Sequence, residues 1–239
     1  MTPSQIIFPK AILFDYDGVI VASESLHWKA WGKLLHSLSI PYDESELESF
    51  CGKTAPEILK LLSAKTCPDW QLTDSEIDKL CLQKNDYYLE FCENELELYP
   101  GVNQGLEWLR EQKVKVAIVS NARKRELLKT AEKLGITKHL DLIIGRDDSN
   151  ASKPDPQAYL FAARALGTGI ENCLAIEDSP TGLQSSLLAG IRSAAVLTNF
   201  TKEILKAPVE GKPELKPAWI GKSMTDFFIW LKSLKQRQS

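Results

Sequence analysis

Short apolar runs alternate with stretches of helical periodicity along most of the chain. The apolar runs are typical of buried strands and cover residues 10–15, 114–119, 141–144, 172–176 and 192–197. Apolar residues recur at helical spacing between these runs and near the C-terminus, over residues 102–112, 123–134, 156–166, 180–189 and 224–235. This alternation predicts an α/β fold, a Rossmann-like doubly wound parallel sheet with helices on both faces.

The interval between the first two predicted strands is far too long for an ordinary crossover connection. It contains helical patterns of its own, over residues 23–38, 43–50, 55–64 and 73–95. Thr73 and Glu76 form a capping-box pattern, and Thr54 is a plausible helix cap. We therefore expect an inserted helical cap domain over residues 28–95, with residues 1–27 and 96–239 forming the core.

The stretch 207–218 holds three prolines and is expected to be a surface loop before the last helix. No internal repeat and no low-complexity tract interrupts the pattern.

Polar clusters follow several of the predicted strands. Asp15 and Asp17 end the first, Ser120, Asn121 and Arg123 follow the second, Lys153 lies in a later loop, and Glu177 and Asp178 follow the fourth. In an open parallel sheet, ligands bind beyond the carboxyl ends of the strands, where the strand order reverses. With strand order 3-2-1-4-5 these clusters would converge. Asp15 would be a nucleophile candidate there, Ser120 and Lys153 could hold a phosphoryl group, and Asp178 could complete a metal site.

Asp15 and Asp17 are the most informative pair. Two carboxylates at the end of a buried strand repel one another and resist desolvation, so a cation, most simply magnesium, is expected between them. Gly18 lets the backbone turn beside that charge. A plain Asp-Gly turn, with Asp17 capping the next segment, is the simpler alternative.

The other clusters also have purely structural alternatives. Ser120 and Asn121 could cap the next helix, and Lys153 could be an ordinary loop lysine. Glu177 and Asp178 could be acidic residues at a helix start, where the helix dipole favours them.

Composition narrows the class of partner. The chain of 239 residues is 44% hydrophobic and 26% charged, which suits a globular protein with a sizeable core. Its net charge of -3 offers no general attraction for nucleic acid or an anionic membrane surface, so neither is expected as a partner. Residues 43–97 carry 14 acidic and five basic residues, a pattern typical of a solvated helical face.

The cysteines and histidines exclude other kinds of site. Five cysteines, at positions 51, 67, 81, 92 and 173, form no C-x-x-C pair, which favours buried thiols in a reducing compartment over disulfides or zinc. His27, His36 and His139 have no nucleophile motif beside them. The N-terminal apolar run is too short for a signal peptide or a spanning helix, and a cytoplasmic location is expected by default.

With all four clusters in order, the sequence resembles the haloacid dehalogenase superfamily, in its capped beta-phosphoglucomutase-like and sugar-phosphate phosphatase branch. The first motif, D-x-D-G-[VT]-[IL], covers residues 15–20, and the others correspond to Ser120, to Lys153 and to Glu177 with Asp178. The first and fourth motifs together are specific to the family, whereas a lone serine or lysine is not.

The resemblance implies a mechanism residue by residue. Asp15 would be the nucleophile that forms an aspartyl-phosphate, and Asp17 the general acid and then base. Mg²⁺ would bind Asp15, the backbone oxygen of Asp17 and Asp178, with Glu177 as a possible further ligand. Lys153, helped by Ser120 and Asn121, would neutralise the phosphoryl oxygens.

The resemblance also narrows the substrate to a small phosphorylated metabolite. Asp17 argues for a phosphate ester, since family dehalogenases and phosphonatases lack that aspartate. Candidate substrate and cap residues are His27, Lys53, Thr54 and Arg123, and His27, Lys29 and Trp31 match the mutase pattern.

Two positions depart from the mutase pattern. Ala55 stands where a mutase has a phosphate-gripping arginine, and Ala22 replaces the usual aspartate after the first motif. Simple hydrolysis is therefore favoured, although Lys53 could substitute for the missing cap arginine and a phosphomutase stays open. The protein is expected to be a monomer.

Two rivals come from other classes. A signalling receiver domain also phosphorylates an aspartate beside magnesium, but it is about half this length and has no such insert. A catalytically silent binding protein of the same family is the second rival, and an activity assay is needed to exclude it.

Overall fold

The computed structural model describes residues 7–43, 47, 50, 53–66, 72–149 and 151–237. The chain divides into two compact units, a larger one of Met1–Ala22 with Leu98–Ser239 and a smaller one of Ser23–Glu97. Most of the predicted helix over 43–50 lies outside the described residues, as do Cys51 and Cys67.

The larger unit is built on one six-stranded sheet of order β3-β2-β1-β4-β5-β6. Every neighbouring pair is parallel. The strands are β1 (Ala11–Phe14), β2 (Lys115–Val119), β3 (Leu142–Ile144), β4 (Cys173–Glu177), β5 (Arg192–Val196) and β6 (Trp219–Gly221). The predicted order of the first five strands is confirmed. After β3 the chain returns to the other side of β1, so the strand order reverses between β1 and β4.

The sixth strand is a correction to the predicted five-stranded sheet. It follows the predicted loop directly and pairs with β5, Ala194 opposite Trp219 and Ala195 opposite Ile220. The Trp219 ring stacks on Trp230 of the last helix, with centroids 5.3 Å apart. A run of only three residues after a proline-rich segment gives no readable period, so tertiary packing defines this strand.

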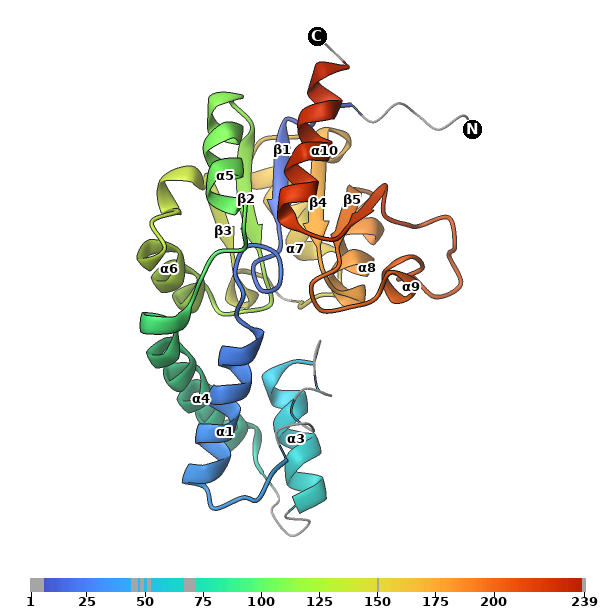
Figure 1. Cartoon of the computed structure of the whole chain (residues 1–239). Coiled ribbons are helices and arrows are strands. Elements are labelled where there is room, and N and C mark those ends of the chain that lie inside the picture. Colours follow the sequence, from blue (N-terminus) through green and yellow to red (C-terminus); the bar gives the residue numbers. More distant parts are fainter. Residues whose placement is uncertain are drawn as a thin grey trace. The chain divides into compact units, whose positions relative to one another are not determined.

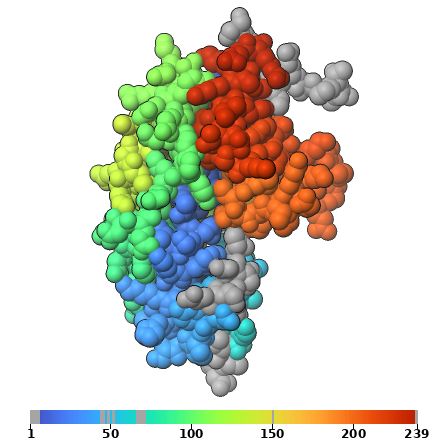
Figure 2. Space-filling model, in the orientation of Figure 1, coloured from blue at the N-terminus to red at the C-terminus, as the bar shows by residue number. Residues whose placement is uncertain are grey.

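Helices cover both faces of the sheet (Figure 1). They are α5 (Val102–Glu111), α6 (Lys124–Lys133), α7 (Gln157–Ala165), α8 (Pro180–Leu188), the one-turn α9 (Lys202–Leu205) and α10 (Met224–Gln236). Three 3₁₀ turns add Thr137–His139, Arg146–Asp148 and Ile170–Asn172. Figure 2 shows α10, in red, beside α5, in green, on one face of this unit.

Alternate residues of β1 serve opposite faces, which is what a doubly wound sheet requires. Ala11 and Leu13 belong to a buried cluster with Tyr159 of α7. The Phe14 ring instead packs edge-on to Phe227 of α10, with centroids 6.2 Å apart. The central strand is therefore fully buried, and any polar group at its end begins inside the protein.

Among its described residues, the smaller unit contains α1 (Glu24–Ser37), α3 (Ala55–Thr66) and α4 (Asp74–Glu95) around a core of its own. The capping box predicted at the start of α4 is confirmed, because the Thr73 hydroxyl accepts from the Glu76 amide and the Glu76 carboxylate accepts from the Thr73 amide. α1 begins at Glu24, and His27 on this helix lies within the smaller unit.

Across the described residues, no helix combines the length and the apolar character that crossing a membrane requires.

Candidate active site at the carboxyl ends of β1, β2 and β4

Lys153 is the centre of a buried ion-pair network. Its Nζ atom donates to Asp15 Oδ1 and to Glu177 Oε1, each at 2.6 Å, and to the Val119 carbonyl at 2.7 Å. Asp15 follows β1, Val119 ends β2 and Glu177 ends β4. One ammonium group thus links the carboxyl ends of three adjacent strands, in the region where ligands bind in open parallel sheets.

Glu177 is held from two sides and is fully buried, with 0% of its surface exposed. Its Oε1 atom also accepts the hydroxyl of Tyr159 at 2.5 Å. Its Oε2 atom has no hydrogen-bond partner among the described residues. A side chain at Gly182 would overlap that oxygen, so the first turn of α8 needs glycine there.

Asp178 is fixed by the segment that follows β5. The side-chain amide of Asn199 donates to Asp178 Oδ2 at 2.7 Å, and the Thr198 hydroxyl donates to the Gly18 carbonyl at 2.7 Å. Gly18 has a φ of +78°, and a Cβ atom there would overlap Asp178 Oδ2. The turn after β1 therefore approaches Asp178 so closely that only glycine fits.

Asn121 positions the lysine loop, and Ser120 supports the turn after β2. Asn121 Oδ1 accepts from the backbone amide of Lys153 at 2.9 Å, while Ser120 Oγ accepts from the Ala122 amide at 3.0 Å. Ser120 is 5% exposed at the end of β2. The serine oxygen therefore accepts within the turn that precedes α6, whose N-cap position is taken by Arg123.

The electrostatics of the cluster favour an additional cation. Burial and the charge of Glu177 raise the pKa of Asp15 to about 8, although Lys153 lowers it. Burial alone would lower the pKa of Lys153, but Asp15 and Glu177 outweigh it and keep the ammonium charged. Two carboxylates thus share one lysine, with a third clustered beside them, and Asp15 tends to keep a proton at neutral pH unless more positive charge lies beside it.

The tyrosine in this network stays neutral. Burial raises the pKa of Tyr159 well above its ordinary value, so the phenol remains a hydrogen-bond donor to Glu177.

The donor set fits a magnesium ion. Asp15, Glu177 and Asp178 each offer a carboxylate oxygen, and these atoms lie within 4.8 Å of one another. Hard oxygen ligands are what magnesium prefers, and the unpartnered Glu177 Oε2 leaves acceptor capacity in the cluster.

The remaining predicted site residues are distributed over both units. Asp17 and Arg123 lie in the larger unit, where Asp17 is near enough to Asp15 to raise its pKa. The Nε atom of Arg123 is buried with no hydrogen-bond partner in the described structure. His27, Lys53 and Thr54 lie in the smaller unit.

Thr54 has a local structural task. Its amide and its hydroxyl both donate to Glu57 Oε2 at 2.7 Å, at the start of α3. These hydrogen bonds hold the pKa of Glu57 below its usual value. The Thr54 side chain thus donates to Glu57 and does not accept from a helix amide in these hydrogen bonds, while Lys53 beside it is exposed.

The smaller unit contains a buried lysine that sequence reasoning missed. Lys84 of α4 is 4% exposed, and its Nζ lies 2.7 Å from His27 Nδ1. The His27 ring stacks on Tyr88 with centroids 4.0 Å apart. The surrounding charged, solvated-looking helix gave no sign that this lysine is buried.

Three residues of the larger unit were also missed. Tyr159 reads in sequence as an apolar position of α7, whereas Thr198 and Asn199 come directly after a predicted strand. The strand-end rule that found the other clusters would have found this pair too.

Comparison with known proteins agrees with the fold and the motifs. Residues 12–196 match the family of haloacid dehalogenase-like hydrolases, and the chain belongs to that family. It is 29% identical to validoxylamine A 7'-phosphate phosphatase of Streptomyces hygroscopicus subsp. limoneus, over 82% of this chain and 89% of that protein.

Two further relatives are phosphomutases. Beta-phosphoglucomutase of Bacillus subtilis is 29% identical over 78% of this chain and 83% of its own length. The solved structure of beta-phosphoglucomutase from Clostridium difficile superposes with a TM-score of 0.78 at 24% identity, covering 96% of this chain and 98% of that one. The branch that the sequence resembles, with both phosphatases and phosphomutases, is confirmed.

Proposed function

We propose that the protein is a magnesium-dependent phosphatase that hydrolyses a small phosphate monoester of the sugar-phosphate class through an aspartyl-phosphate on Asp15. The observation that carries the proposal is the buried contact of Lys153 Nζ with Asp15 Oδ1 beside Glu177 and Asp178. A nucleophilic carboxylate, a charge-neutralising ammonium and a carboxylate pair are the groups that this chemistry needs.

Magnesium would be held by Asp15, the backbone oxygen of Asp17 and Asp178, with Glu177 in the same cluster as a further oxygen donor. When bound, it would supply positive charge that keeps Asp15 ionised and offsets the charge of the phosphate. Thr198 and Asn199 hold the Gly18 turn and Asp178 in register for this site.

The chain's own residues carry the two chemical steps. Asp15 attacks phosphorus while Asp17 donates a proton to the leaving alkoxide, which departs as an alcohol. Asp17, now a carboxylate, then takes a proton from water as the water oxygen attacks phosphorus and releases inorganic phosphate from Asp15. Lys153 neutralises the phosphoryl oxygens, while Glu177 and Tyr159 fix the lysine in place.

We propose that Ser120 and Asn121 complete phosphate binding and that Arg123 binds the substrate, since its buried Nε has no partner among the described residues. The smaller unit, the expected cap over residues 28–95, would select the substrate through His27, Lys53 and Thr54. We also propose that the protein acts as a monomer in the cytoplasm and has no nucleic acid or membrane partner.

A phosphomutase is the second candidate, because beta-phosphoglucomutases are among the relatives. A mutase must grip a sugar phosphate by its distal phosphate, and Ala55 supplies no charge for that grip. Hydrolysis is favoured on this ground.

The product of beta-glucose 1-phosphate separates the two candidates. We expect inorganic phosphate to be released from hexose phosphates without a bisphosphate primer, with little glucose 6-phosphate formed. A panel of sugar phosphates, phosphoglycolate and nucleotides, assayed for phosphate release, would identify the substrate class. Primed enzyme that makes glucose 6-phosphate faster than free phosphate would establish the mutase, and Lys53 would then be the cap residue to replace.

Gly18→Ala should weaken magnesium binding and lower activity strongly, because the new Cβ would overlap Asp178 Oδ2 and lie 2.6 Å from Asn199 Nδ2. Gly135→Ala is the matched control: Gly135 has a similar φ of +68°, but no atom of the described residues lies within 4 Å of its Cβ position. Both variants carry the backbone strain, of roughly 1–2 kcal/mol. Calorimetric magnesium titration of both checks this, and equal affinities would contradict the close approach.

A further inference from the structure

A cavity lies in the larger unit at the opposite end of the sheet from the candidate active site. It has a volume of about 460 Å³ and lies where β1, β2 and β4 begin. Along the five residues of β2, at about 3.3 Å per residue, the two ends of the sheet are roughly 15 Å apart. The cavity is therefore separate from the site that holds Asp15.

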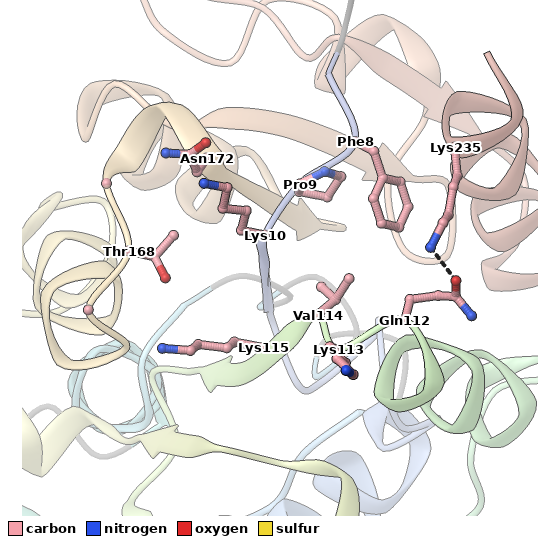
Figure 3. A pocket seen from close by; sticks show the side chains of 12 residues that line it. Phe8, Pro9, Lys10, Gln112, Lys113, Val114, Lys115, Thr168, Asn172 and Lys235 are labelled. Atoms are coloured by element: carbon pink, nitrogen blue, oxygen red, sulfur yellow. Dashed lines mark hydrogen bonds between the residues drawn. The ribbon is translucent and has the colours of Figure 1, made fainter. Parts of the chain in front are cut away.

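Four lysines line this cavity, and no aspartate or glutamate is among its described lining residues: Lys10, Lys113, Lys115 and Lys235. In Figure 3 the side chains of Lys10 and Lys115 lie on the same side of the cavity as Thr168 and Asn172. Glu111 and Glu171 directly precede the lining residues Gln112 and Asn172, and the Glu171 Oε1 atom accepts from Asn172 Nδ2 at 2.9 Å.

Two of the four lysines have structural tasks. Lys115 Nζ donates to the Leu166 carbonyl at the end of α7, at 2.5 Å. Lys235 Nζ donates to the Gln112 side chain and lies 5.3 Å from the centre of the Phe8 ring. Cations at helix C-termini are ordinary features, so these two alone would indicate no ligand.

Lys10 and Lys113 have no such task. Within the described part of the chain, neither side chain makes a hydrogen bond or an ion pair, and both residues are exposed. Lys10 is held only through its backbone, which donates to the Asn172 carbonyl and accepts from the Lys115 amide. Two unpaired ammonium groups thus lie beside two anchored ones around one hollow.

The backbone at Lys113 closes helix α5. Lys113 follows the end of α5 with a φ of +59°, in the left-handed position that usually takes glycine. Its amide donates to the Arg110 carbonyl and the next amide, of Val114, to the Leu109 carbonyl, which closes the helix. Lys113 thus places a long cationic side chain at the end of α5, in the same kind of helix end that Ser39 forms after α1 with a φ of +56°.

We propose that this lysine-lined cavity, formed by Lys10, Lys113, Lys115 and Lys235, binds a small polyanion that carries a di- or triphosphate group. A single negative charge could not satisfy cations that come from three segments of the chain, whereas a phosphate chain presents several acceptor oxygens. The cavity volume lies within the range of small-molecule sites.

Calorimetric titration of tripolyphosphate in metal-free buffer tests the proposal. The samples are the wild type, the variant Lys10→Gln/Lys113→Gln and the control Lys202→Gln/Lys206→Gln. The control removes two exposed lysines of the α9 region. We expect one saturable site in the wild type and in the control. The affinity for tripolyphosphate should be at least tenfold weaker in Lys10→Gln/Lys113→Gln, and added salt should weaken binding to the wild type. Thermal unfolding and phosphatase activity of that variant should match the wild type, because neither residue belongs to the candidate active site.

Two results would overturn the proposal: absence of saturable binding to the wild type, or equal affinity in the wild type and the Lys10→Gln/Lys113→Gln variant. A parallel titration with adenosine triphosphate shows which part of a ligand is recognised. Equal affinity for both compounds would support recognition of the phosphates alone, and tighter binding of the nucleotide would support an added contact with its nucleoside.

Discussion

Asp15→Asn should abolish phosphate release, because Asp15 is the only residue proposed to form a bond to phosphorus and an amide is not a nucleophile toward a phosphate ester. The fold should survive the change. The amide is nearly isosteric, its oxygen can still accept from Lys153, and repulsion with Glu177 is relieved. Steady-state assays of phosphate release, with thermal unfolding of the same samples, check both expectations.

Asp78→Asn is the matched control for that variant, since Asp78 is exposed on α4 and the same chemical change there should leave activity intact. Turnover of Asp15→Asn at the wild-type rate would remove the mechanism from consideration.

Asp17→Asn should lower the rate by roughly 10²–10⁴-fold, the usual range for loss of a general acid and base. The backbone oxygen of residue 17 is unchanged, so magnesium affinity should stay close to that of the wild type. Activity as a function of magnesium concentration, with direct calorimetric titration of the metal, separates the two quantities.

Asp178→Ala should show the reverse pattern, with weak magnesium binding as its main defect, because Asp178 contributes one of the three clustered carboxylates. For Asp17→Asn, a loss of magnesium affinity that parallels the loss of activity would contradict the prediction. It would make the Asp17 side chain a metal ligand and refute its role as acid and base.

Much of the fold could be predicted because its signals are local. Each of the first five strands is a short apolar run, and the Thr73 capping box is readable over four residues. β6 could not be found in this way, since Trp219–Gly221 becomes a strand only by pairing with β5 and by packing of Trp219 on Trp230.

The candidate site was predictable where its residues follow strands. Asp15, Glu177 and Asp178 come directly after or at the end of an apolar run, and the structure brings them together with Lys153. Tyr159 was not predictable, because its hydroxyl reaches Glu177 only through the packing of α7 on the sheet.

Lys84 was missed for a related reason. Lysine is almost never fully buried, so its position in a helix rich in acidic residues indicated a solvated side chain. Its contact with His27 depends on the packing of α1 against α4, which no pattern within either helix encodes.

The central claim, a covalent phosphoryl group on Asp15, is tested most directly by trapping it. Enzyme mixed with an excess of its best phosphate-ester substrate and magnesium is quenched in acid within one turnover, digested and analysed by mass spectrometry. The account predicts that the peptide containing Asp15 gains the mass of one phosphoryl group, with no such gain in Asp15→Asn. Rapid turnover with Asp15 unmodified, or a phosphoryl group on another residue, would contradict it.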